Sequence, residues 1–411
     1  MTYLPNIDIQ ASRSPSTDAF GRWRVSNPAT LYSCTHTYDL NPLMWESHIV
    51  GGATIAHSGS RSGVTLTVNS PGDLAIRQTY DYWQYQPGKS HYAKFTFVMG
   101  PHLAGTRCAV GYYDDSDGVF LERGADGIAY IVLRSSVSGA PVDIRIAQSN
   151  WNVDKLDGTG ISGETLDLTK AQILLIDLQY LGVGSVRVGL DILGKCVDAH
   201  EFHNANLIGS VYMSTGSLPL RYEVEDVSSV AAGAYMEQIC SEISAEGGWD
   251  IDIGLPFSAD TGVTPAAMLN GVERSIITIR PRLLFGAKPN RGLLIPAAVE
   301  IYNVGANPVL WTTHFYSTSA AAVFADVDAT NSIGQSSVSQ VAVAGGIKTG
   351  SGYLAPSAGV FRGSPYTAEI RNRLYLSLDM AAASQREFCL AGTGVGGASS
   401  VYAAVVWAEL R

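Results

Sequence analysis

Short runs in which apolar and polar residues alternate recur along most of the chain. Clear examples are residues 94–99, 128–134 and 186–192, which are rich in β-branched and aromatic side chains. Glycine and proline, with 43 and 17 residues, separate these runs every several positions. Alternation with a period of two between turn-forming residues is typical of a β-sandwich, because successive side chains of a strand point to opposite faces. The pattern therefore predicts an all-β protein.

Helical periodicity is nearly absent, and the best helical candidates are short, at residues 264–272 and 231–239. Further along, residues 298–302 and 309–313 are two apolar runs joined by turn-forming residues, which predicts a β-hairpin. The apolar run at residues 402–408 predicts a final strand.

Changes in this pattern divide the chain into four parts. Residues 1–35 begin with a polar stretch without strand alternation and predict an extended N-terminal arm. Residues 36–226, where strands are dense, predict a lectin-like (concanavalin-like) jelly-roll β-sandwich. The small residues within 227–248 predict a linker, and residues 249–411 predict a second, smaller C-terminal β-sandwich. Two domains also suit a chain of 411 residues.

The composition favours a chain held in an assembly. Charged residues make up only 16% of it, against an average of about 25%. The chain has 20 Arg, 7 Lys and 20 Tyr, and interfaces are enriched in Arg and Tyr and depleted of Lys. High genomic GC content is the alternative source of this bias.

The net charge of −10 argues against nucleic acid as a partner, because phosphate binding needs a clustered basic surface. No apolar stretch reaches the roughly 20 residues of a membrane span, and the N-terminus lacks a signal-peptide pattern, so we expect synthesis in the cytoplasm of the host cell. Five widely spaced cysteines without a CxxC pair predict no zinc or redox motif, and free thiols rather than disulfides. No cofactor is expected.

Residues 18–28 read DAFGRWRVSNP, and residues 84–90 read QYQPGKS. The first segment resembles the DAFGRxRVSNP opening, and the second the YQPGKS stretch, of a group of tailed-bacteriophage virion structural proteins. Residues 145–169 and 218–223 are similar to further segments of the same proteins. The resemblance covers residues 18–225 well and the C-terminal half only loosely.

This resemblance implies a structural subunit of a tailed-phage virion, held in a symmetric assembly by copies of itself and by other virion proteins. A tail, fibre or neck position is favoured, and capsid decoration or a head fibre is the alternative. A second alternative is a module that binds host-surface carbohydrate, or a polysaccharide depolymerase. The expected location is the virion.

Four side chains of the N-terminal segment are candidates for assembly contacts. Phe20 and Trp23 offer apolar anchors, and Arg22 and Arg24 alternate with apolar neighbours as in a strand that pairs with a sheet edge. The alternative is an ordinary first strand of the same domain.

Glu223 and Glu225 are candidates for catalysis. Alternation in a strand places both carboxylates on one sheet face, where a glycosidase pair could act. Paired acids on an exposed strand are usually only solvated, so we expect no enzyme and no catalytic residue.

Two acidic turns superficially resemble cation sites. The first has Asp114, Asp115 and Asp117 with Gly118, followed by Glu122, and the second has Asp154 and Asp157 with Gly158. Calcium needs several oxygens converging from one loop, and neither run has the full spacing of such a loop. We therefore expect no metal site.

Tyr80, Tyr82, Trp83 and Tyr85 form a cluster of aromatic residues in the sequence. Exposed rings could stack on a glycan, whereas buried rings would serve as core or interface anchors. Both interpretations stay open from the sequence.

Overall fold

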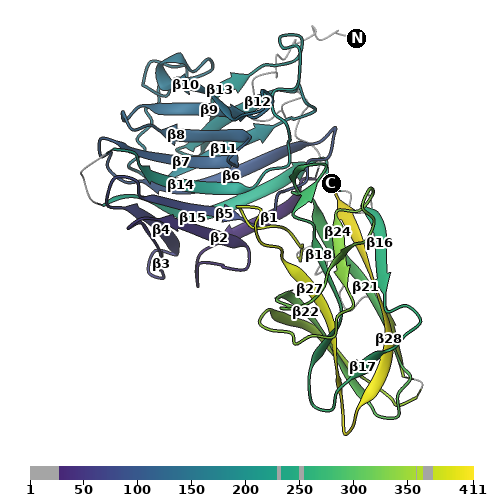
Figure 1. Cartoon of the computed structure of the whole chain (residues 1–411). Coiled ribbons are helices and arrows are strands. Elements are labelled where there is room, and N and C mark those ends of the chain that lie inside the picture. The colour runs from purple at the N-terminus through teal and green to yellow at the C-terminus, as the bar shows by residue number, and fades with distance from the viewer. Residues whose placement is uncertain (1–26, 229–232, 250–253, 358, 364–373) are drawn as a thin grey trace, which may run out of the picture. The chain divides into compact units, whose positions relative to one another are not determined.

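The structure is a computed structural model, and its described residues divide into two compact units (Figure 1). Unit 1 comprises Met1–Thr79 and Tyr85–Asp250, and unit 2 comprises Tyr80–Gln84 and Ile251–Arg411. The described residues are 27–228, 233–249, 254–357, 359–363 and 374–411.

Unit 1 consists of two antiparallel sheets, as expected for a β-sandwich. The first has eight strands in the order β13-β12-β11-β6-β15-β4-β3, with β1 also paired to β15. The second has seven strands in the order β10-β9-β8-β7-β14-β5-β2. The strands of the first sheet are β1 (Ala29–Thr35), β3 (Thr54–Ser58), β4 (Gly63–Val68), β6 (Ser90–Met99), β11 (Gln172–Leu178), β12 (Val186–Ile192), β13 (Lys195–Phe202) and β15 (Ala234–Glu246). Those of the second are β2 (Trp45–Val50), β5 (Leu74–Thr79), β7 (Thr106–Tyr113), β8 (Gly118–Arg123), β9 (Ala129–Ser135), β10 (Val142–Ala147) and β14 (Leu220–Asp226).

The core of unit 1 lies between these sheets and has an aromatic centre. Tyr222 of β14 lies 5.9 Å from the rings of both Trp45 and Phe95, measured between centroids. Its hydroxyl meets the Ser241 hydroxyl of the opposite sheet at 2.9 Å. All four side chains are buried, as expected for the space between two packed sheets.

A buried arginine also joins the two sheets. Arg77 of β5 is fully buried, and its Nε donates to Gln238 Oε1 of β15 over 2.7 Å. Its guanidinium lies over the Trp45 ring, 5.5 Å from the centroid. Burial lowers the pKa of Arg77 to about 10, which leaves the side chain charged at neutral pH.

Unit 2 is a second sandwich. Its five-stranded sheet has the order β16-β28-β21-β26 with β17 paired to β28, and its six-stranded sheet has the order β23-β24-β18-β27-β22-β25. A short pair, β19 (Leu284–Phe285) and β20 (Lys288–Pro289), completes it. The five-stranded sheet contains β16 (Leu255–Asp260), β17 (Ala266–Met268), β21 (Leu293–Asn303), β26 (Val360–Gly363) and β28 (Ser399–Leu410). The six-stranded sheet contains β18 (Arg274–Pro281), β22 (Val309–Ser317), β23 (Ala325–Asp326), β24 (Gly334–Ser337), β25 (Ile347–Leu354) and β27 (Glu387–Gly394).

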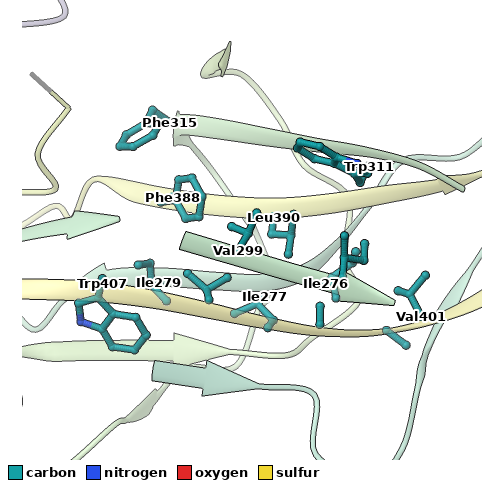
Figure 2. Close-up of a cluster of buried hydrophobic side chains, with 14 of the residues drawn as sticks. Ile276, Ile277, Ile279, Val299, Trp311, Phe315, Phe388, Leu390, Val401 and Trp407 are labelled. Atoms are coloured by element: carbon teal, nitrogen blue, oxygen red, sulfur yellow. The ribbon is translucent and has the colours of Figure 1, made fainter. Parts of the chain in front are cut away.

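Figure 2 shows the core of unit 2, which is filled by aliphatic and aromatic side chains from both sheets. Phe315 and Phe388 meet with ring centroids 5.0 Å apart, and Trp407 is fully buried. Unit 2 therefore has a hydrophobic core of its own, as the prediction of a C-terminal sandwich requires.

The predicted linker, residues 227–248, is wrong over most of its length. Ala234–Glu246 forms β15, which pairs with β6 and β4 and lies inside the eight-stranded sheet. A β-bulge between Gln238 and Cys240 shifts the register. The bulge breaks the period-two alternation, which is the signal that would have identified this strand in the sequence.

Other local predictions also need correction. Residues 298–302 and 309–313 are strands but not a hairpin, because β21 and β22 lie in different sheets of unit 2. The helical candidates form β17 and β15 instead, and the predicted arm, residues 1–35, includes the paired strand β1. The described residues include one short 3-10 turn, Gln148–Asn150, and none of their helices is long and apolar enough to cross a membrane.

Candidate functional site

A network of charged side chains lies on the outer face of the seven-stranded sheet in unit 1. Strand register places Glu122 of β8, Ala109 of β7 and Glu223 of β14 in one row. Arg107 and Glu225 are paired in the next row. Because alternate residues of a strand share a face, these side chains point away from the core between the sheets.

The charges rest on a small apolar floor, which is a separate cluster of buried side chains formed by Ala109, Tyr113, Phe120 and Val132. Arg134 covers this floor, with its Cζ 5.2 Å from the Phe120 ring centroid and 5.9 Å from that of Tyr113. A guanidinium stacked on an aromatic face keeps its N–H edge free for acceptors. The arginine therefore closes the floor and remains available for hydrogen bonds.

Arg107 joins three carboxylates across the face. It donates to Glu122 Oε2 over 3.3 Å and to Glu225 Oε2 over 3.0 Å, and it also contacts Glu223 Oε1. Its side chain is 19% exposed, so the pairing takes place where water has limited access. Charge-assisted hydrogen bonds of this kind are stronger than those between neutral groups.

Glu223 is the most strongly held of these carboxylates. Arg221 donates to its Oε2 from Nε over 2.9 Å and from Nη2 over 2.6 Å. Burial alone would raise the pKa of Glu223, but the guanidiniums of Arg221 and Arg107 outweigh it and lower the pKa from 4.5 to about 2. Glu223 is therefore a permanent anion at neutral pH.

Two further arginines lie at the rim of the network. Arg134 donates to both carboxylate oxygens of Asp143, over 2.8 and 2.9 Å. Arg145 contacts Glu122, and its Cζ lies 4.2 Å from the ring centroid of Tyr130. The side chains of Arg134, Arg145 and Asp143 are 15%, 41% and 28% exposed, so a ligand can reach them.

A pocket of about 370 Å³ opens on this face. Ala125 and Val227 give it an apolar edge. Three arginines and three carboxylates line the rest: Arg107, Arg134, Arg145, Glu122, Asp126 and Asp143. The charges of this lining balance, and it offers both donors and acceptors.

The structure places Glu223 and Glu225 on one sheet face, as the alternation predicts, but not as a solvated pair. Glu223 is buried within the arginine network, whereas the side chain of Glu225 is 37% exposed. A carboxyl group with a pKa near 2 does not donate a proton at neutral pH, so Glu223 lacks the property of a general acid.

The four aromatic residues of the sequence cluster do not form one exposed platform. Tyr82 and Trp83 are 2% and 3% exposed within unit 2, where Arg291 lies over the Tyr82 ring at 4.4 Å. Tyr80 lies under Arg386 in the same unit, at 4.0 Å. Tyr85 belongs to unit 1.

In unit 1, Tyr85 packs against His91 and Tyr180 with centroids 5.4 and 5.6 Å apart. Tyr82 and Trp83 are therefore too deeply buried to stack on a glycan, whereas Tyr80 and Tyr85 are half-buried.

The acidic turn at residues 114–117 is occupied by internal hydrogen bonds. Asp114 Oδ1 accepts from the backbone N–H groups of Ser116 and Asp117, over 2.7 and 2.9 Å. Asp117 accepts from both the backbone and the hydroxyl of Ser136 and of Ser214. These carboxylates hold the turn against two other loops.

The second acidic turn is built in the same way. Asp154 accepts from the backbone N–H groups of Leu156 and Ser162, over 2.8 and 2.7 Å. Asp157 Oδ1 accepts from Thr159 N at 2.9 Å. Nowhere in the described part of the chain do three His, Cys, Asp or Glu side chains gather as a metal site would require. The assembly-arm candidates Phe20, Arg22, Trp23 and Arg24 lie outside the described residues.

Arg107, Arg134 and Arg145 were not identified from the sequence, and Glu122 was named only beside the acidic turn at residues 114–117. Each occupies one position in an ordinary strand, and the partners come from distant segments: Arg107 and Glu223 are 116 residues apart. The available signal was a charged residue at alternate positions of otherwise apolar strands. That signal identifies a polar face but not which strands share it.

Neither a family profile nor a curated protein matches the sequence. Several solved structures match about half of the chain, at low identity and low TM-score. The exoplasmic/lumenal domain of VIP36 in its metal-free form is 9% identical, covers 53% of this chain and 92% of its own, and gives a TM-score of 0.32. A legume lectin-like domain from Entamoeba histolytica is 9% identical over 52% and 96%, with a TM-score of 0.31. A glycosyl hydrolase family 16 protein from Mycobacterium smegmatis is 11% identical over 52% and 100%, with a TM-score of 0.35. The all-β prediction is confirmed by the antiparallel sheets of both units.

Proposed function

We propose that this chain is a non-catalytic subunit of a tailed-phage virion and that unit 1 binds a neutral glycan. The observation that carries the binding function is the charge-balanced pocket on the outer face of the seven-stranded sheet. The virion setting is supported by the sequence resemblance at residues 18–28, 84–90, 145–169 and 218–223.

Charge balance selects the class of ligand. Guanidinium groups only donate hydrogen bonds and carboxylates only accept them, whereas a sugar hydroxyl does both. A neutral polyol can therefore insert between the two kinds of group without leaving a charge unpaired. An anionic ligand would compete with Glu122 and Asp143 for their arginines, and a cationic ligand would compete for the carboxylates.

The size of the pocket fits a small part of a glycan. A volume of about 370 Å³ lies near the lower end of ligand pockets, which run from about 300 to 1,000 Å³. One or two sugar rings match such a volume, and the remainder of a chain would extend over the exposed rim at Arg145 and Asp126.

Binding without hydrolysis is supported by the state of Glu223. Its carboxylate is ionised and bonded to two guanidiniums, so proton donation to a leaving oxygen would first require the loss of both ion pairs. A depolymerase using Glu223 and Glu225 is the competing function. Release of oligosaccharide that is abolished by Glu223→Gln or Glu225→Gln would establish it.

The binding function is tested with the full chain on an array of neutral, acidic and basic glycans. We expect binding to neutral glycans. Asp143→Asn removes one negative charge and releases Arg134, so it should weaken neutral binding and raise binding to acidic glycans by about tenfold. Asp157→Asn makes the same charge change in an exposed turn outside the pocket and should leave the array pattern unchanged.

Binding that does not change in Asp143→Asn would contradict the assignment of this pocket. The virion function has a separate test, in which mass spectrometry and cryo-electron microscopy of purified particles detect the chain and locate it. Particles that lack the chain would remove that part of the proposal.

A further inference from the structure

Unit 2 has a second hollow, on the outer face of its five-stranded sheet. Strand register places Asp260 of β16, Ala404 of β28 and Glu300 of β21 in one row across this face. The adjacent row contains Tyr402 of β28 and Tyr302 of β21. The intervening residues of β28, such as Val401 and Val405, point to the opposite side and belong to the core of the unit.

A small residue creates the depth of this hollow. Ala404 lies between the two carboxylates, which stand on the strands to either side of it. Since neighbouring strands are about 4.8 Å apart, the Cα atoms of Asp260 and Glu300 are separated by about 10 Å. The resulting trough has a volume of about 610 Å³.

The walls of the trough are aromatic and are held in place. Tyr302 is 38% exposed and is paired with Val360 of the edge strand β26, which is 58% exposed. The Tyr402 hydroxyl donates to the backbone oxygen of Val263 over 3.1 Å, which fixes the orientation of that ring. Two tyrosines with accessible faces in adjacent strands offer a flat surface to an apolar ligand face.

The charged groups of the trough are hydrogen-bond acceptors. Asp260 uses Oδ1 to accept from the backbone of Gly262 at 2.7 Å, which orients its carboxylate. Glu300 accepts from Arg362 at 3.2 Å, but both of these side chains are largely exposed, at 46% and 79%, so the pair is weak. Among the described residues, the lining of the trough contains these two carboxylates and no basic side chain. A matching ligand must therefore donate hydrogen bonds.

We propose that this trough binds a pyranose ring of a saccharide. A pyranose presents C–H groups on one face, which can stack on Tyr302 and Tyr402, and hydroxyl donors at its edge, which can reach Asp260 and Glu300. Neutral sugars and amino sugars share this chemistry, and the amino sugar adds an ammonium group that suits two carboxylates and two aromatic faces. The inference is independent of the glycan site in unit 1, because the two pockets share no residue and no unit.

The test uses saturation-transfer NMR on the full chain. The ligands are the methyl glycosides of glucose, galactose, mannose, N-acetylglucosamine and glucosamine, each up to about 10 mM. At these concentrations the method detects dissociation constants near 1 mM. We expect saturation transfer to at least one of them. Ala404→Leu fills the floor of the trough and Tyr302→Ala removes a stacking face, so each should weaken binding at least tenfold. A larger signal for glucosamine that falls with added salt would identify the amino sugar as the preferred source.

Two variants control the assignment. Ala408→Leu makes the same enlargement on the same strand, four residues after Ala404 and outside the lining of the trough. It should leave binding unchanged. Asp143→Asn alters the unit 1 pocket and should also have no effect on this trough. Absence of transfer to all five sugars, or transfer that survives both Ala404→Leu and Tyr302→Ala, would overturn the proposal. Self-association abolished by Ala404→Leu would assign the face to a second copy of the chain instead.

Discussion

Replacing Glu223 by glutamine keeps the size of the side chain but removes the charge that two buried guanidiniums share. Arg221 and Arg107 would then face an amide whose nitrogen is a donor, so each would lose one charged acceptor in a site where Glu223 and Arg221 are 4% and 3% exposed. Arg221 would keep Asp115, and Arg107 would keep Glu122 and Glu225. Breaking a buried ion pair from one side is costly because the remaining charge stays desolvated. We therefore expect Glu223→Gln to destabilise unit 1.

The expected loss can be worked out from the pKa of Glu223. Its decrease from 4.5 to about 2 corresponds to about 3 kcal/mol, at about 1.4 kcal/mol per pKa unit. Since the pKa is depressed in the folded state, this stabilisation is complete above the unfolded-state value of 4.5 and is lost as the pH falls through about 2. At pH 3 about 1 kcal/mol should remain.

The assay is denaturant unfolding, monitored by hydrogen-exchange mass spectrometry of peptides from β7 and β14. This readout reports unit 1 alone, which matters because a chain with two units need not unfold in a single transition. The free energy of unfolding should differ between the wild type and Glu223→Gln by about 3 kcal/mol at pH 7 and by about 1 kcal/mol at pH 3.

Glu225→Gln is the matched control. The side chain of Glu225 is 37% exposed and contacts only Arg107 in this network, so its loss should cost less than about 1 kcal/mol. A Glu223→Gln protein as stable as the wild type, or one whose loss of stability is the same at pH 7 and pH 3, would contradict the role of this ion pair.

Three other predictions follow from the structure. Gly111→Ala should destabilise unit 1 by about 3 kcal/mol in thermal unfolding, because a Cβ there would lie 2.5 Å from a backbone oxygen of β8. Gly72→Ala is the control: its Cβ would lie in open space, and the positive φ of +86° should lower the free energy of unfolding by about 1 kcal/mol. Asp117→Ala should lower the free energy of unfolding by about 3 kcal/mol, because four hydrogen-bond donors lose their acceptor. Chelation or added calcium should leave the melting temperature of the wild type unchanged. A rise of several degrees with calcium would contradict the structural role of this turn. Deletion of residues 1–26 should leave circular dichroism unchanged, because β1 begins at Ala29, yet weaken assembly in sedimentation; normal assembly of the truncated chain would show the arm to be dispensable.

The regular strands were predictable from the sequence because each carries its own alternation. Residues 186–192 coincide with β12, and the run at residues 402–408 lies inside β28. In such strands one face is buried at every second position, so the alternation of apolar and polar residues predicts which positions are buried.

Where the backbone departs from regular pairing, the same reasoning fails. β15 contains a bulge, and its apolar residues change phase at Cys240, so a strand inside a sheet resembled a linker. β21 and β22 follow each other closely in the chain, yet they pair in different sheets. Local sequence does not determine which sheet a strand joins, because that choice depends on edges and faces supplied by distant segments.

The sequence alone determined the all-β class, the presence of two sandwiches and the shared face of Glu223 and Glu225, since each of these depends on local alternation and turn residues. Tertiary structure decided the chemistry of that face. Arg107, Glu122 and Glu223 belong to strands far apart in the chain, and only the register of β7, β8 and β14 brings them together. Burial and the two guanidiniums then set the charge of Glu223. The same holds for the trough in unit 2, where Asp260, Ala404 and Glu300 become neighbours only through strand pairing.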